Sequence, residues 1–281
     1  MKEPETSHLG ILGVYEKAIS NHLSWEEKLI LAHDSGFDCV EMSIDGTPER
    51  MSRLYSPSEA ETVRSAICST GVPIYTLALT LNRKYPLGSE DFEIRSRGIE
   101  LVKRAVGFAE EIGIRVMHLA GYDDLGEKSC EKTGELFYES VRSIMDYAAD
   151  SRVQLAIETM DAAFMGSCRR IRALCEEIGS PKLRIYADVG NLAGMGYDLA
   201  EELRIGGDYI IGVHLKDSLL GVMRDVSFGE GIVDFCLAFQ SLKEIGYQGP
   251  MIAEMWSYDQ ESFHPYLKTA SAFLRNKMTE C

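Results

Sequence analysis

Eight short apolar runs alternate with longer amphipathic segments along the 281-residue chain. Near-continuous apolar runs of this length are typical of parallel strands that are buried on both faces. The runs are 8–15 (HLGILGVY), 38–44 (DCVEMSI), 73–79 (PIYTLAL), 115–121 (RVMHLAG), 153–159 (VQLAIET), 183–189 (LRIYADV), 210–217 (IIGVHLKD) and 250–256 (PMIAEMW). This alternation limits the chain to α/β architectures.

The segments between the runs carry the start and stop signals of helices. Ser24 stands at an N-cap position with Glu27 three residues later, and Gly113 and Gly179 end later segments in a recurring Ile-Gly pattern. Eight such strand–helix units predict one (β/α)8 TIM barrel over residues 1–281. An open doubly wound sheet is the alternative, and it is disfavoured because no glycine-rich phosphate-binding motif follows any run.

The composition predicts a globular protein that does not bind nucleic acid. Hydrophobic residues make up 45% of the chain, and the formal net charge is −15. This charge argues against binding to nucleic acid or to anionic membranes, and a phosphorylated metabolite would need a few locally gathered basic groups. No apolar run is long enough to span a membrane, and residues 1–8 lack an apolar signal segment. We therefore expect a cytoplasmic protein.

Seven cysteines are scattered along the chain without a CxxC pair. An odd number at irregular spacing favours reduced thiols over a disulfide framework. We expect most of them to pack as small apolar side chains.

The last four apolar runs each carry one metal-capable side chain near the carboxyl end: Glu158, Asp188, His214 and Glu254. Ionisable groups are seldom left in a buried strand unless they are paired or bound to metal. In a barrel these four ends meet at one mouth. Three carboxylates and one imidazole suit a single divalent cation such as Mn²⁺, Mg²⁺, Co²⁺ or Zn²⁺. Taken singly, His214 could be an ordinary core histidine and Asp188 a helix cap.

The motifs ExMD, DVGN, HLKD, GEG and EMW together resemble the xylose-isomerase-like barrel superfamily. The stretches LGVYEKAI, GFDCVEMSIDGTPERMSRL, HLAGYDD, DAAFM and RDVSFGEGIVDF are similar to the L-xylulose-5-phosphate (L-ribulose-5-phosphate) 3-epimerase family of ascorbate-type pentose catabolism. The resemblance implies a metal-dependent isomerase of sugar phosphates that forms a homodimer or a higher homo-oligomer.

The resemblance also implies roles for individual residues. Glu158, Asp188, His214 and Glu254 would hold the metal, and Glu158 and Glu254 would exchange the proton at C3 through an enediolate. Epimerases of free ketoses have a histidine three residues after the metal-binding aspartate, whereas this chain has Asn191 there. The difference is compatible with a phosphorylated substrate.

Further residues are candidates for binding substrate. Arg224 lies in the loop after the seventh run, where related epimerases also have an arginine, and Lys216 shares the face of His214 by the strand period of two. Lys216 could instead pair with Asp217. The remaining candidates are Asn191, Arg83 with its neighbour Lys84, and Glu230, which could equally hold its loop. We expect His118 to have a core or supporting role.

Four other functions compete with this interpretation. The alternatives on the same barrel are an epimerase or isomerase of a different ketose, with or without a phosphate, an aldose–ketose isomerase with two metals, and an endonuclease with three zinc ions. The two-metal isomerase and the three-zinc endonuclease both need more metal ligands than the six histidines of this chain readily supply. A non-enzymatic binding module is the fourth, and it predicts no proton exchange at a sugar carbon.

Overall fold

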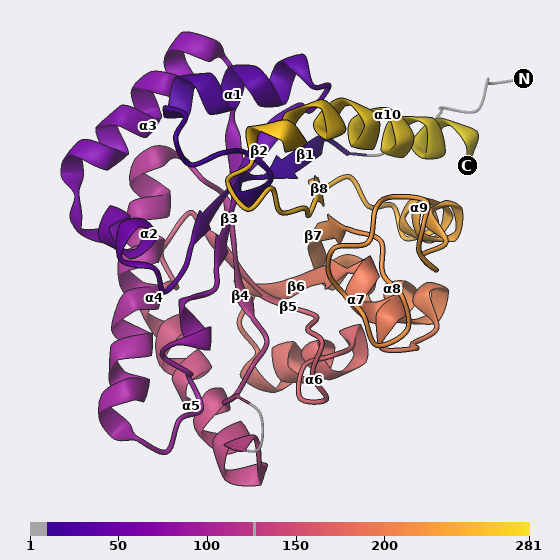
Figure 1. Cartoon of the computed structure of the whole chain (residues 1–281). Coiled ribbons are helices and arrows are strands. Elements are labelled where there is room, and N and C mark those ends of the chain that lie inside the picture. Colours follow the sequence, from indigo (N-terminus) through magenta and orange to yellow (C-terminus); the bar gives the residue numbers. More distant parts are fainter. Residues whose placement is uncertain (1–9, 126–127) are drawn as a thin grey trace, which may run out of the picture.

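The computed structural model describes residues 10–125 and 128–281, in which eight parallel strands close into a barrel in sequence order (Figure 1). The strands are β1 (Leu12–Tyr15), β2 (Cys39–Ile44), β3 (Ile74–Leu79), β4 (Val116–Ala120), β5 (Gln154–Glu158), β6 (Leu183–Asp188), β7 (Ile210–Leu215) and β8 (Met251–Ala253). Pairing of Leu12 with Met251 joins β1 to β8 and closes the barrel. The predicted (β/α)8 fold is confirmed.

Each strand lies inside the run that predicts it. The first run starts two residues before the described part of the chain, and the eighth strand is much shorter than its run because it ends at Ala253. Glu254 therefore follows β8, and its backbone N–H still donates to the carbonyl of Leu215 in β7, at 2.8 Å. The side chain of Glu254 consequently stands at the rim of the barrel.

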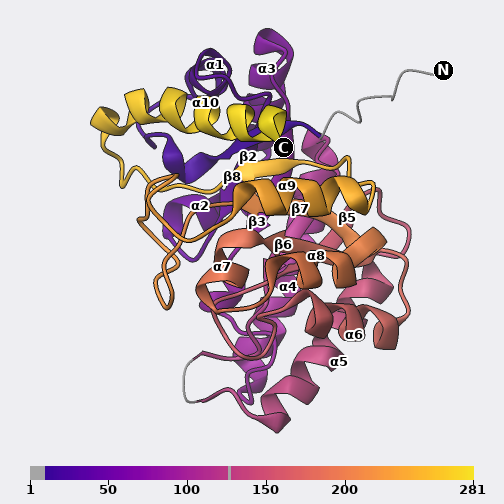
Figure 2. The ribbon, with the colours of Figure 1, turned by 90° about the vertical axis from the view of Figure 1, so that its right-hand side faces the viewer.

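Helices surround the barrel, and Figures 1 and 2 show them outside the strands. They are α1 (Trp25–Asp34), α2 (Pro48–Ser52), α3 (Pro57–Thr70), α4 (Phe92–Ile112), α5 (Glu131–Tyr147), α6 (Cys168–Ile178), α7 (Val189–Gly194), α8 (Leu199–Gly206), α9 (Phe235–Glu244) and α10 (His264–Glu280). The eight strand–helix units predict one helix after each strand, and the short helices α2 and α7 are additional to these eight. The capping box of Ser24 and Glu27 is present, and Gly113 and Gly179 end α4 and α6 in the left-handed conformation that glycine tolerates best.

Two apolar layers position the site. A large cluster fills the space between strands and helices, and a smaller one around Tyr15, Ala156, Tyr186 and Ile252 lies inside the barrel. The interior is therefore packed with side chains, and the carboxyl ends of the strands carry the open face.

Cys236 in α9 and Cys281 after α10 form a disulfide, with their Cα atoms 5.3 Å apart. The expectation of reduced thiols is wrong for this pair, because the fold brings the last residue of the chain beside α9. The other five cysteines are free, and Cys39, Cys168 and Cys175 are buried as expected.

No helix in residues 10–125 and 128–281 combines the length and the apolar character that crossing a membrane requires.

Candidate active site

Four side chains from consecutive strands converge at the carboxyl end of the barrel. Glu158 ends β5, Asp188 ends β6, His214 lies in β7 and Glu254 follows β8. One ligand atom of each lies within 4.8 Å of those of the other three. The register explains this, because Asp188 and His214 are directly paired between β6 and β7.

Within this cluster the His214 ring faces two carboxylates. Its Nδ1 lies 2.9 Å from Oε1 of Glu158 and 3.7 Å from Oε2 of Glu254. Asp188 has a double role: Oδ1 accepts the backbone N–H groups of Gly190 and Asn191 at the start of α7, at 2.9 and 3.0 Å. The helix cap considered for Asp188 and its place in the cluster are thus both present.

The ammonium group of Lys216 lies among these carboxylates. Its Nζ is 2.6 Å from Oδ2 of Asp188, in an ion pair without aligned hydrogen-bond geometry, and 2.8 Å from Oε2 of Glu254. Asp217, considered as a partner for Lys216, instead accepts the backbone N–H groups of Gly229 and Gly231 and so holds the loop after β7. The Lys216 ammonium therefore supplies a positive charge beside two of the three carboxylates, those of Asp188 and Glu254.

The electrostatics of the cluster separate its two best-buried carboxyl groups. Burial disfavours the carboxylate of Glu158, but His214 and His118 outweigh it and hold the pKa of Glu158 well below its usual range. Burial raises the pKa of Asp188 to about 7, although the Lys216 ammonium opposes this rise. Glu158 is thus held ionised, while Asp188 titrates near neutrality.

The donor set fits a divalent cation. Three carboxylates and one imidazole, with ligand atoms within 4.8 Å of one another, are the donor types that hard or borderline metal ions prefer. Oδ2 of Asp188 is buried without a hydrogen bond, and its contact is with a positive charge. Glu158, Asp188, His214 and Glu254 are the residues that would hold the ion.

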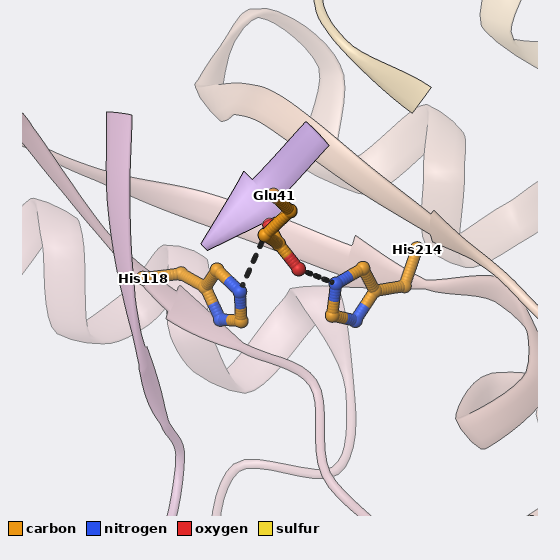
Figure 3. A group of neighbouring side chains, drawn as sticks. All are labelled: Glu41, His118 and His214. Atoms are coloured by element: carbon orange, nitrogen blue, oxygen red, sulfur yellow. Dashed lines mark hydrogen bonds and ion pairs between the residues drawn. The ribbon is translucent and has the colours of Figure 1, made fainter. Parts of the chain in front are cut away.

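The structure adds Glu41 of β2, which the sequence analysis did not single out. Its Oε1 lies 2.6 Å from Nε2 of His214 (Figure 3), whereas Glu158 faces Nδ1 of the same ring. His118 of β4 lies between Glu41 and Glu158 and is fully buried, so its predicted core position is confirmed. The sequence does contain a signal for Glu41, because it is a charged residue inside the apolar run DCVEMSI. The rule that buried ionisable groups are paired or bind metal, which identified the other carboxylates, applies to it as well.

A cavity of about 800 Å³ opens above the cluster. Glu158, Glu254, Lys216 and Asn191 lie in its wall. The amide of Asn191 also donates to the carbonyl of Thr159, at 2.8 Å. A ligand of metabolite size bound in this cavity would contact the two glutamates.

Arginines predicted to bind substrate also line this cavity. The guanidinium of Arg224 lies over the Trp256 ring, 4.5 Å from its centroid, and that of Arg83 lies over the ring of Tyr122, at 5.0 Å. Glu230 is exposed and is not among the lining residues in the described part of the chain. The structure therefore gathers every predicted substrate-binding residue at the cavity except Glu230.

The comparisons with known proteins agree with this geometry. Residues 29–277 match the family model described as xylose isomerase-like TIM barrel. The chain is 40% identical over 252 residues to L-ribulose-5-phosphate 3-epimerase UlaE of Salmonella heidelberg (strain SL476), covering 89% of both proteins. It is 38% identical over 270 residues to the enzyme of the same name from Escherichia coli O157:H7 (strain EC4115 / EHEC), covering 96% of this chain and 95% of that one.

The chain belongs to the L-ribulose-5-phosphate 3-epimerase family of xylose-isomerase-like TIM barrels. This membership, which the sequence motifs predicted, makes the chain an isomerase-class enzyme. Solved structures of other proteins share the fold of this chain. A D-allulose 3-epimerase from Methylomonas sp. in complex with D-allulose superposes with a TM-score of 0.79 at 17% identity, covering 96% of this chain and 98% of that one. An L-ribulose 3-epimerase superposes with a TM-score of 0.78 at 18% identity, covering 97% and 95%.

Proposed function

We propose that the chain is a metal-dependent 3-epimerase of a ketopentose 5-phosphate, interconverting L-ribulose 5-phosphate and L-xylulose 5-phosphate. The observation that carries this proposal is that ligand atoms of two glutamates, one aspartate and one histidine lie within 4.8 Å of one another, with both glutamates in the wall of a cavity. The names of the relatives at about 40% identity give the substrate class.

The reaction needs a proton to leave C3 of the ketose and another to return on the opposite face. A divalent cation held by the four ligands would supply positive charge that stabilises the enediolate oxygens. Glu158 and Glu254 approach the cavity from β5 and β8, with β6 and β7 between them. One removes the C3 proton as a carboxylate, and the other returns a proton as a carboxylic acid.

The neighbours of Glu158 suit this residue to act as the base, because they hold its pKa low and keep its carboxylate ionised. Glu254 is less buried and contacts Lys216. In the reverse reaction the two glutamates exchange roles, as microscopic reversibility requires. Lys216 and Asn191 lie in the cavity wall, and we propose that they contact the hydroxyl and carbonyl oxygens of the sugar.

A phosphate group needs local positive charge in a chain whose net charge is −15. Six basic residues line the cavity: Lys17, Arg50, Arg83, Lys84, Lys216 and Arg224. Lys17 and Arg50 both contact Asp45, at 2.7 and 3.5 Å, and Lys84 donates to the nearby carbonyl of Gly46 at 3.3 Å. Lys17 and Arg50 are thus paired with a carboxylate that also lines the cavity, and the support for a phosphorylated substrate comes from Arg83, Lys84 and Arg224.

The test is an NMR assay in D₂O with L-ribulose 5-phosphate and free L-ribulose, with and without chelator. We expect deuterium at C3 and formation of L-xylulose 5-phosphate, abolished by the chelator and restored by Mn²⁺, Mg²⁺, Co²⁺ or Zn²⁺. Faster reaction of the free ketose would replace the proposed substrate by a non-phosphorylated one. Absence of C3 exchange with both ketoses in the presence of metal would refute the function.

Two further expectations remain predictions: the cytoplasmic location and the homodimer or higher homo-oligomer. Size-exclusion chromatography with light scattering tests the second.

A further inference from the structure

A second polar group lies in the barrel interior, beneath the metal-ligand cluster. Glu41 of β2 is completely buried, and its contacts include Thr76 of β3, His118 of β4, Tyr186 of β6 and His214 of β7. A buried carboxylate is costly unless hydrogen bonds satisfy its oxygens. The contacts of Glu41 must therefore compensate for the cost of burying its carboxylate.

The contacts of Glu41 divide between its two oxygens. Oε2 accepts the hydroxyl groups of Thr76 and Tyr186, at 2.7 and 2.8 Å. Oε1 meets Nε2 of His214 at 2.6 Å. Gly212 is the paired residue of Tyr186 in β7, and a Cβ there would lie 2.2 Å from the Tyr186 ring, so glycine makes room for the tyrosine that anchors Glu41.

The two nitrogens of His214 face different groups. Nε2 points to Glu41, as Figure 3 shows, while Nδ1 faces the carboxylate of Glu158 at 2.9 Å. Both ring nitrogens face carboxylates, and an ionised carboxylate favours hydrogen on the nitrogen beside it. A divalent cation bound by the cluster would take the place of the hydrogen on Nδ1, and Glu41 would keep the remaining hydrogen on Nε2. That tautomer leaves the lone pair of Nδ1 for the metal.

His118 connects Glu41 to a second ligand. Its Nε2 lies 3.3 Å from Oε2 of Glu41 and its Nδ1 lies 3.4 Å from Oε2 of Glu158, in ion-pair contacts without aligned hydrogen-bond geometry. The ring stacks on Tyr186, with centroids 4.1 Å apart, which fixes its plane. Glu41 thus contacts one metal ligand directly and reaches another through one histidine.

We propose that Glu41 is a positioning residue that fixes His214 with Nδ1 as the metal donor and, through His118, orients the carboxylate of Glu158. Partners of this kind hold the ring of a metal-binding histidine in place and raise its basicity. The inference rests on the proposed function in one respect: it requires that the four-residue cluster binds a divalent cation.

The first test uses the unmodified chain with ¹⁵N-labelled histidine and Zn²⁺. Long-range ¹H–¹⁵N spectra should show His214 with Nε2 protonated and Nδ1 bound to zinc. Zinc bound through Nε2 would overturn the positioning role while leaving the cation site intact. Failure of zinc to bind would overturn the cation site, and the inference with it.

The second test measures Mn²⁺ affinity by chelator competition in Glu41→Gln. We expect binding about 10- to 100-fold weaker than in the unmodified chain, the range for lost supporting contacts of metal ligands. Glu16→Gln is the matched control. Glu16 is equally buried, but its partners are Lys28 and Arg53, at 2.9 and 2.8 Å, so this variant should bind Mn²⁺ normally.

Two results would contradict the assignment. One is Mn²⁺ affinity in Glu41→Gln equal to that of Glu16→Gln. The other is a stoichiometry of two ions per chain by elemental analysis, falling to one in Glu41→Gln, since Glu41, His118 and His214 would then form a metal site of their own.

Discussion

Replacing Lys216 by methionine tests the charge balance of the candidate site. The ammonium lies 2.6 Å from Asp188 and 2.8 Å from Glu254, and the lysine side chain is 8% exposed. Removing one partner of a buried ion pair leaves an uncompensated charge and costs about 3–5 kcal/mol. Because burial already raises the pKa of Asp188 to about 7, proton uptake by Asp188 relieves part of this cost. We therefore expect Lys216→Met to lower the free energy of unfolding by about 3 kcal/mol at pH 8.

A loss of about 3 kcal/mol corresponds to a fall in Tm of roughly 6–12 °C for a domain of this size. The assay is thermal unfolding of metal-stripped protein at pH 8, with Lys84→Met as the control. Lys84 is exposed, and its ammonium donates to the Gly46 carbonyl and lies over the Tyr85 ring, so its replacement should change stability by less than about 0.5 kcal/mol. Saturating Mn²⁺ should close most of the gap between Lys216→Met and the unmodified chain. The reasoning would be refuted if the Tm of metal-stripped Lys216→Met lay within about 2 °C of the Tm of the Lys84→Met control. A difference of about 2 °C corresponds to about 1 kcal/mol in the free energy of unfolding.

Three further predictions concern metal, acid and phosphate. Because a cation must displace the proton of Asp188, its apparent affinity should fall up to about tenfold for each pH unit below about 7, as titration calorimetry at several pH values would measure; a pH-independent affinity would count against Asp188 as a ligand. Burial opposes ionisation of Asp45, but Lys17 and Thr47 lower its pKa to about 2, so this carboxylate stabilises the fold above pH 4 and loses that effect between pH 4 and 2. Urea unfolding should show Asp45→Asn less stable by about 1–2 kcal/mol at pH 7 and equal to the unmodified chain near pH 2; a constant difference across this range would contradict the assignment. Lys84→Ala should raise the KM for L-ribulose 5-phosphate about tenfold, the effect of one lost charge-assisted hydrogen bond, and leave that for free L-ribulose unchanged; an equal effect on both would exclude a phosphate role for Lys84.

The strands and the metal ligands could be predicted because both depend on local patterns. A parallel strand buried on both faces is almost continuously apolar, so a carboxylate or histidine at its end is conspicuous. Glu158, Asp188 and His214 each stand at or next to the last residue of an observed strand. Knowing the fold class was then enough to bring them together.

The supporting residues depend on geometry that a single sequence does not contain. Glu41 lies in the interior of β2, and its contact with His214 crosses 173 positions of the chain. Lys216 was assigned to the correct face, but its pairing with Asp188 and Glu254 depends on the spacing of three strands. The Cys236–Cys281 disulfide likewise follows from where α10 ends.

The central claim is that Glu158 and Glu254 act as two bases on opposite faces of one substrate carbon. The most direct measurement is solvent deuterium exchange at C3 in Glu158→Gln and Glu254→Gln, each loaded with metal, starting separately from L-ribulose 5-phosphate and L-xylulose 5-phosphate. We predict that epimerisation falls at least about a hundredfold in both variants. Each variant should still exchange the C3 proton of one epimer, and the two variants should favour opposite epimers. Near-normal turnover in either metal-loaded variant, or exchange of both epimers by either one, would contradict the two-base account.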